Sequence, residues 1–343
     1  MNLTNDILCC PYPSIDRSNA LLTSMRNKIC DNFAYLSAKV LEKIDLNYDT
    51  LISDINKYRD SDSPLSIIST FHTLLTSLVK SGNHKAIIAL FYDFKALNVK
   101  RKAFSLIPHN TPNQILLLKE QKIISDVGKN SFDGTYNRKF TFDRPTVDSM
   151  SIFEVALYRS LEAVYSLDNI LFKELSAILD YIWVVQTNNM NAGVSFQTYG
   201  IVYIREMHEG EHWTRILEHL VHEAGHLYLY AVMTIDPIFD KNQSNEQYSS
   251  PFRIADRPIG GIYHAMFVLA RTIYIFSLFK KHSLYQKHFE HIKTSYNEQE
   301  NDEDFIIKFN LAYRIIKENA HLTTIGTLLL NNCADLVHSV SSN

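Results

Sequence analysis

The sequence predicts a mainly α-helical protein of the α+β kind, with a small β-sheet next to the helix that carries its chief motif. Apolar residues recur at helical spacing through most of the chain, for example at Leu22, Met25 and Ile29. Two short runs rich in β-branched and aromatic residues, 181–185 and 200–204, flank a polar link that contains a glycine. These runs predict two or three strands within an otherwise helical fold.

The first part of the chain is expected to be helical over about residues 18–97, with a break where Ser-Asp-Ser-Pro at 61–64 interrupts the periodicity. From 101 to 145 the composition becomes irregular, with prolines, glycines and short alternating pieces. This stretch is a candidate hinge or substrate-contacting insert. We therefore expect a helical N-terminal region with an irregular insert at 1–145, suited to binding a substrate peptide.

The second part of the chain, 146–343, is expected to be the catalytic domain. It begins with helical periodicity over about 149–179 and continues through the two β-rich runs. The later segments are a helix at Trp213–Met233, a loop with three prolines at about 236–258, a helix at about 260–281 and helical segments over 285–337.

The composition of the 343 residues is that of a packed globular protein, with 46% hydrophobic residues and a formal net charge of −3. That charge argues against a nucleic-acid partner, since no basic cluster interleaves with aromatic residues. The four cysteines lack CxxC spacing and the N-terminus lacks a secretory pattern, so we expect a cytoplasmic protein. No membrane span is expected, because the most apolar run, His264 to Phe279, is too short and contains Arg271.

The most informative motif is HExxH, formed by residues His222 to His226 within the predicted helix 213–233. Histidines four residues apart lie on one face of a helix, so both imidazoles can reach one metal ion, while Glu223 points to a neighbouring sector. Gly225 is a weak helix former, which indicates that another segment packs close to the backbone there. The alternative is a core helix whose histidines hydrogen-bond to carbonyl groups.

Two histidines do not complete a metal site, since zinc hydrolases and non-haem iron enzymes use three protein ligands. The extended pattern HExxHxxGxxH is excluded by Leu229 and Val232. Glu246 could complete a zinc site, but its polar surroundings are typical of a solvated loop. His264 is the stronger candidate, because it lies in the first turns of an apolar helix, where an unpartnered imidazole would be costly to bury.

Three arginines near these histidines could bind the distal carboxylate of a dicarboxylic co-substrate. Arg271 lies seven residues after His264 and shares its helix face, although an interhelical salt bridge is the alternative. Arg253 and Arg257 lie in a stiff, proline-containing turn just before that helix, where Asp256 could pair with either of them.

Blocks of sequence around the HExxH helix form a more specific pattern. They are LVHEAGHL at 220–227, DP at 236–237, SPFR at 250–253, DRPI at 256–259 and GIYHAMFVLAR at 261–271. Together they resemble the HExxH-motif peptide-modification proteins, a family of 2-oxoglutarate-dependent peptide β-hydroxylases that act on ribosomally made precursor peptides. The resemblance is clear over about residues 191–279 and loose over the C-terminal helices.

This resemblance implies a helix-rich fold unlike the double-stranded β-helix of most 2-oxoglutarate oxygenases. It also implies an Fe(II) site with His222, His226 and His264 as ligands. The motif glutamate, Glu223, is implied to be a catalytic residue that supports a ligand rather than binding the iron. Because three neutral histidines differ from a set of two histidines and one carboxylate, bound 2-oxoglutarate must supply the anionic charge.

The implied reaction is hydroxylation of an unactivated β-carbon in a side chain of a precursor peptide, or cyclisation as a variant outcome. Dioxygen and 2-oxoglutarate are the expected co-substrates, with the distal carboxylate bound by Arg271 as first choice, Arg257 as second, or Arg253. The precursor peptide is the expected partner. Nucleic acid and membrane are not expected as partners, and a homodimer is compatible with the sequence.

Two other functions fit part of the sequence. A zinc metallopeptidase with Glu223 as general base would explain the pentapeptide alone, but neither His264 nor the arginine-containing turn. A non-catalytic protein that binds precursor peptides would use the helical N-terminal region to hold a leader segment and would carry a vestigial motif.

Overall fold

The structure, a computed structural model, describes residues 8–44, 50–59, 62–97, 100–107, 126–132, 139–187, 190–240, 246–250, 256–289, 291 and 305–341. Helices dominate these residues and strands form small sheets, as the sequence predicts. The described strands form one sheet of four strands and one of two. This arrangement differs from the double-stranded β-helix, as expected.

The chain divides into two compact units. The first unit contains residues 1–21, 146–178 and 207–343, and the second contains 22–145 and 179–206. Contacts between segments far apart in the sequence join the N-terminal residues to the first unit and the β-rich region to the second.

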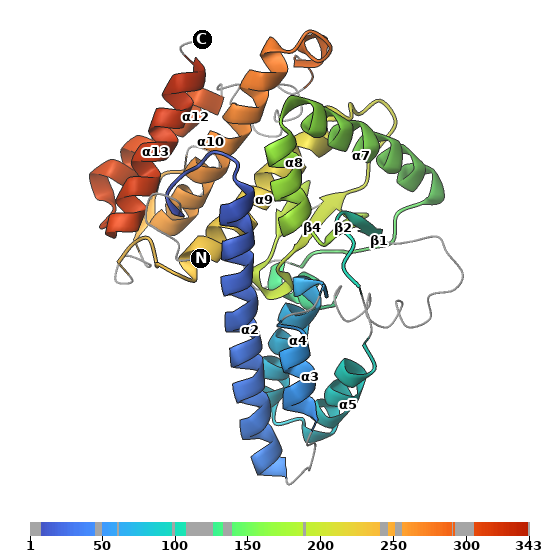
Figure 1. The fold of residues 1–343 in the computed structure, drawn as a ribbon. Helices are drawn as coiled ribbons and strands as arrows, with labels where there is room; N and C mark the ends of the chain where they lie inside the picture. Colours follow the sequence, from blue (N-terminus) through green and yellow to red (C-terminus); the bar gives the residue numbers. More distant parts are fainter. Residues whose placement is uncertain are drawn as a thin grey trace. The chain divides into compact units, whose positions relative to one another are not determined.

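The first unit is mainly helical. Its helices are α7 (Val147–Leu167), α8 (Asn169–Ile178), α9 (Thr214–Met233), α10 (Ile259–Lys281), α12 (Phe305–Asn319) and α13 (Thr324–Ser341), with the first residues of α2 (Ile15–Ile44). In Figure 1, α10 lies beside α12 and α13, and it packs against α9 as well. Within the loop expected between α9 and α10, β5 (Gln247–Tyr248) pairs with β6 (Arg257–Pro258).

The motif helix α9 begins one residue after its predicted start and ends at the predicted residue. Its apolar face is fully buried, with Leu217, Leu220 and Leu227 each 0% exposed. Burying each of these leucines contributes about 1.5–3 kcal/mol. A Cβ atom added at Gly225 would lie 3.1 Å from Cγ1 of Val268 on α10. Gly225 therefore allows a close approach of α10 to α9, as the sequence indicates.

Helix α10 is longer than the apolar run from which the sequence excluded a membrane span. It has 23 residues, and among the described helices it alone is long and apolar enough to cross a membrane. However, 78% of its most apolar stretch is buried inside the protein, as in the core helix of a globular domain. The helix extends beyond the predicted apolar run in both directions, and the burial of its most apolar stretch agrees with the expectation that this segment does not span a membrane.

The second unit contains the four-stranded sheet, in the order β1 (Ser105–Ile107), β2 (Tyr181–Val185), β4 (Ile201–Arg205) and β3 (Ala192–Val194). Strand β2 is parallel to both β1 and β4, whereas β3 is antiparallel to β4. Strands β2, β3 and β4 agree with the two or three strands predicted, and β1 lies in the region expected to be irregular. Aromatic side chains pack on the sheet, and the ring centroids of Phe132 and Tyr203 are 5.4 Å apart.

Helices make up the rest of the second unit: most of α2, then α3 (Leu51–Lys57), α4 (Leu65–Ser81) and α5 (His84–Lys95). The predicted break is present, because Pro64 is extended and α4 starts directly after it. Helix α4 ends at Gly82, whose φ of 66° is in the left-handed region that glycine adopts readily. The side chain of Asn83 then accepts a hydrogen bond from Ala86 N and caps α5.

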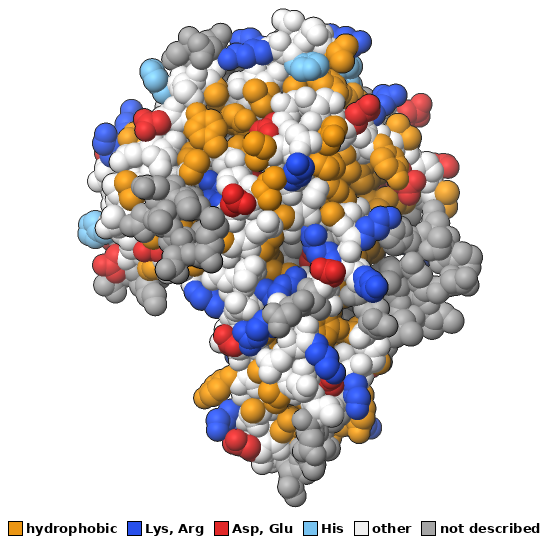
Figure 2. Space-filling model, in the orientation of Figure 1, with side chains coloured by type: hydrophobic (Ala, Val, Ile, Leu, Met, Phe, Trp, Pro, Cys, Tyr) orange, Lys and Arg blue, Asp and Glu red, His pale blue; other side chains and the backbone are white. Residues whose placement is uncertain are grey.

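The surface carries charges of both signs. Figure 2 shows Lys and Arg side chains interspersed with Asp and Glu over the visible face, in keeping with the net charge of −3.

Candidate metal centre

The two histidines of the HExxH motif lie on one face of α9, as their spacing requires. The ring centroids of His222 and His226 are 5.1 Å apart, and both residues are partly buried. Glu223 is 6% exposed, and its negative charge acts on the imidazole of His222. The motif therefore faces the interior of the first unit, where neighbouring helices can contribute further side chains.

His264 is the neighbour that α10 contributes. Its Nδ1 atom lies 3.2 Å from Nδ1 of His226, and the two ring centroids are 5.4 Å apart. The ring of Tyr230 covers His264 from α9, with 5.0 Å between the centroids. His226 thus contacts both His222 and His264, and we call these three residues the metal-centre cluster, after the role that the sequence predicts for them.

The spacing within this cluster suits a metal ion in part. Two nitrogen ligands with bonds of about 2.1 Å, at tetrahedral or octahedral angles, lie roughly 3.0–3.4 Å apart. The 3.2 Å between the ring nitrogens of His226 and His264 falls within this range. Among the described residues, however, no group of three or more His, Cys, Asp or Glu side chains converges ready to hold a metal ion.

Electrostatics favour neutral imidazole at His264. Burial and, to a lesser extent, the positive charge of Arg257 together lower the pKa of His264 to about 4. A neutral ring keeps a lone pair for a metal ion, so His264 does not need to lose a proton at pH 7 before it binds one.

Arg257 is the predicted arginine that lies near the metal-centre cluster. It is in β6, directly before α10, and its Cδ lies 3.7 Å from the point where a Cβ atom of Gly261 would be. The side chain therefore folds over the first turn of α10, one turn before His264. Its charge acts on His264, as the lowered pKa of that imidazole indicates.

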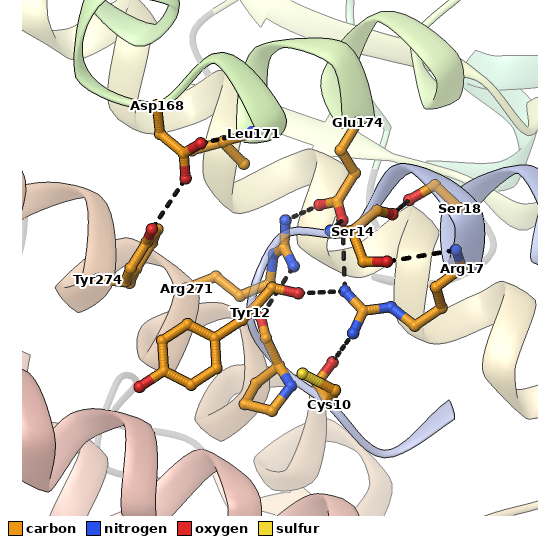
Figure 3. A network of polar contacts seen from close by, with 11 residues as sticks. Cys10, Tyr12, Ser14, Arg17, Ser18, Asp168, Leu171, Glu174, Arg271 and Tyr274 are labelled. Atoms are coloured by element: carbon orange, nitrogen blue, oxygen red, sulfur yellow. Dashed lines mark hydrogen bonds and ion pairs between the residues drawn. The ribbon is translucent and has the colours of Figure 1, made fainter. Parts of the chain in front are cut away.

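The sequence made Arg271 the first choice for binding 2-oxoglutarate, but in the structure its guanidinium already has a carboxylate partner. Its guanidinium is 3% exposed and forms an ion pair with Glu174 of α8, and it donates to the carbonyl oxygen of Pro11 at 3.1 Å. Figure 3 shows Arg271 and Arg17 both reaching Glu174. The structure contains the interhelical salt bridge that the sequence left open as the alternative for Arg271.

The remaining predicted residues are Arg253 and Glu246. Arg253 lies outside the described residues. Glu246 is exposed, and its carboxylate accepts a hydrogen bond from the hydroxyl of Tyr248. The contacts described for Glu246 do not include the histidines of the motif, so His264 is the side chain that the structure adds to His222 and His226.

Sequence reasoning missed Glu218, which contacts the cluster from within α9. Its Oε1 lies 3.2 Å from Nδ1 of His222, and its Oε2 lies 2.8 Å from Nδ1 of His219. Burial acts to raise the pKa of Glu218, but the two histidines hold it at about 2. The signal in the sequence was the four-residue spacing from Glu218 to His222, which continues the spacing of the motif by one turn.

No protein-family model matches this chain, and no curated protein is significantly similar to it.

Proposed function

We propose that this protein is an Fe(II)- and 2-oxoglutarate-dependent oxygenase that hydroxylates a β-carbon of a side chain in a ribosomally made precursor peptide. One observation carries the proposal. His264, rather than Glu246, lies against His226, so the third side chain at the motif is an imidazole. A zinc peptidase of this kind would need a downstream glutamate as its third ligand. Glu246 is the candidate, but its described contact is with Tyr248 and not with the histidines of the motif. The sequence blocks around the motif support the same choice.

Three imidazoles suit Fe(II) with an anionic co-substrate, because nitrogen ligands bind this ion well and bring no negative charge of their own. In the proposed site His222, His226 and His264 would hold the iron. Bound iron would supply the oxidation in which peptide C–H, dioxygen and 2-oxoglutarate give peptide C–OH, succinate and carbon dioxide. The protein would supply orientation and exclusion of water, which the burial of α9 and α10 supports.

Arg257 takes first place among the candidates for the distal carboxylate of 2-oxoglutarate. The guanidinium of Arg271 already faces the buried carboxylate of Glu174, so a second carboxylate would have to displace that partner. The side chain of Arg257 lies over the first turn of α10, one turn before His264, and its charge acts on that imidazole. This position suits a co-substrate that reaches from the iron to an arginine. Arg253, four residues earlier, stays a second candidate.

Glu223 distinguishes this proposal from a zinc peptidase. A peptidase needs the carboxylate to deprotonate a metal-bound water, whereas an oxygenase needs no such base. We infer that Glu223 supports the ligand set through its charge beside His222. In this proposal the protein works in the cytoplasm on a precursor peptide, with dioxygen as the second co-substrate.

The test is anaerobic reconstitution with Fe(II), followed by addition of 2-oxoglutarate and air. We expect a visible charge-transfer band when 2-oxoglutarate binds, and release of succinate that needs both iron and oxygen. Glu223→Gln should keep measurable succinate release, because the carboxylate is not the oxidising group. Cleavage of peptide bonds with zinc alone, lost in Glu223→Gln, would replace the proposal with a metallopeptidase.

A further inference from the structure

Glu218 is a buried carboxylate held between two imidazoles. It is 1% exposed, on a helix whose other buried side chains are mostly apolar. Removing a carboxylate from water costs several kcal/mol unless charged or N–H partners compensate for the loss. Here the compensation comes from Nδ1 of His219 at 2.8 Å and Nδ1 of His222 at 3.2 Å.

The contact with His222 determines where the proton of that ring lies. An ionised carboxylate only accepts hydrogen bonds, so Nδ1 of His222, which contacts Oε1, must carry a proton. In neutral His222 the lone pair then belongs to Nε2, the nitrogen at the opposite side of the ring. Nε2 is thereby available to a metal ion, and the contact at Nδ1 restricts rotation of the ring.

We infer that Glu218 is a positioning residue of the metal centre: through the contact of its Oε1 with Nδ1–H of His222, it sets the tautomer of His222 and leaves Nε2 for the metal. This inference rests on the metal site of the proposed function, although not on its oxidation chemistry. A carboxylate behind a metal-binding histidine also makes the ring a stronger donor, and loss of such a partner typically costs about 10–100-fold in metal affinity.

His219 approaches the other oxygen of the same carboxylate. It follows Glu218 directly in the sequence and is 8% exposed, and its Nδ1 lies 2.8 Å from Oε2. This contact is a close approach of polar groups and not a hydrogen bond, so the contact that bears on the metal centre is the one between Oε1 and His222.

The test uses Co(II), whose visible spectrum reports coordination and which needs no oxidative chemistry. Affinity is measured by competition with a chelator for the wild type and Glu218→Gln, and the Tm of each metal-free protein is recorded in parallel. The amide of glutamine can accept from only one imidazole and carries no charge. We expect about 10–100-fold weaker Co(II) binding and a changed visible spectrum in Glu218→Gln.

Glu174→Gln is the matched control, because Glu174 is equally buried in the same unit but contacts Arg17 and Arg271. It should lower Tm and leave Co(II) affinity within about threefold of the wild type. If Glu218→Gln does not fold, Glu218→Asp, which keeps the charge but withdraws the oxygens from His222, should show at least a tenfold loss.

The outcomes separate the two proposals. Equal Co(II) affinity and spectrum in the wild type and the Glu218 variant would overturn the role of Glu218 alone and leave the metal centre standing. A wild type that takes up no Co(II) would overturn the metal centre itself, and the positioning role with it.

Discussion

The metal-centre cluster has a counterpart at the start of α9, the stacked cluster of His212, His288 and His291. Both contain three imidazoles, but their rings are oriented differently. The rings of His212 and His291 lie face to face, with centroids 4.0 Å apart and planes at 10°. A nitrogen lone pair lies in the plane of its ring, so two stacked rings cannot both bind one ion. Ring orientation, rather than the number of histidines, therefore decides whether three imidazoles can share one ion.

The two clusters also differ in charge. The pKa of His212 is lowered to about 4 by burial, and then by His291, His288 and Arg159, all of which are cationic or can become so. In the metal-centre cluster the carboxylates of Glu218 and Glu223 raise the pKa of His222 against the effect of burial. A bound cation would therefore be stabilised at His222 and repelled by the positive groups around His212.

The largest effect is expected when one imidazole is removed from each cluster. His264→Ala should abolish turnover and lower metal affinity by more than the roughly 100-fold that loss of a supporting partner can cost. His212→Ala should bind metal within about threefold of the wild type. The metal content of each variant after reconstitution is measured by mass spectrometry. Equal losses of metal in the two variants would show that the two clusters do not differ in metal binding.

A second large effect is expected further along α10, where Arg271 forms a buried ion pair with Glu174. Arg271→Ala leaves the buried carboxylate of Glu174 with Arg17 as its remaining charged partner. We expect a loss of about 3 kcal/mol in the free energy of unfolding. For a unit of this size, that loss is a fall in Tm of roughly 6–12 °C. Thermal denaturation measures it, and an unchanged Tm with a raised KM for 2-oxoglutarate would restore Arg271 to the active site.

Arg257→Ala should raise the KM for 2-oxoglutarate and leave the Tm nearly unchanged, the opposite of Arg271→Ala. Without the guanidinium the distal carboxylate of 2-oxoglutarate loses its partner, a cost of about 2 kcal/mol or more, so the KM for 2-oxoglutarate should rise by roughly 30-fold. The KM for peptide and the Tm should change little, because Arg257 is in a short surface strand. Steady-state succinate release provides both constants, and a KM within threefold of the wild type would rule Arg257 out.

The smallest expected effect concerns the pH dependence of stability in the stacked cluster. The pKa of His212 is about 4 in the folded protein and 6.5 in the unfolded chain. Between these values the unfolded chain binds the extra proton, so this contribution to stability is full above pH 6.5 and is lost as pH falls toward 4. His212→Gln should show a smaller fall in Tm from pH 7.5 to 5, by a few degrees at most, since His212 is partly exposed. An identical fall in both proteins would contradict the lowered pKa.

Local patterns predicted the fold well where a segment's structure depends on its own residues. The bounds of α9 and the close approach at Gly225 both follow from spacing and helix propensity within one segment. Strand β1 was missed because its three residues are stabilised by parallel pairing with β2, which is far away in the chain. Its sequence alone carries no period long enough to detect.

The candidate site was predictable in the same sense. His222 and His226 follow from helical spacing, and His264 from the cost of burying an imidazole in an apolar helix. The role of Arg271 could not be chosen, because its partner Glu174 lies 97 residues away on another helix. Glu218 was missed because a single glutamate in a helix is ordinarily a solvated residue, and its burial depends on the surrounding helices.

The most direct test of the central claim is the position of the metal itself. A crystal grown anaerobically with Fe(II) should show an anomalous difference peak at the wavelength of the iron edge. We predict that this peak lies about 2.1 Å from one nitrogen each of His222, His226 and His264. A peak bound by His212, His288 and His291, or one completed by Glu246 in place of His264, would contradict the account.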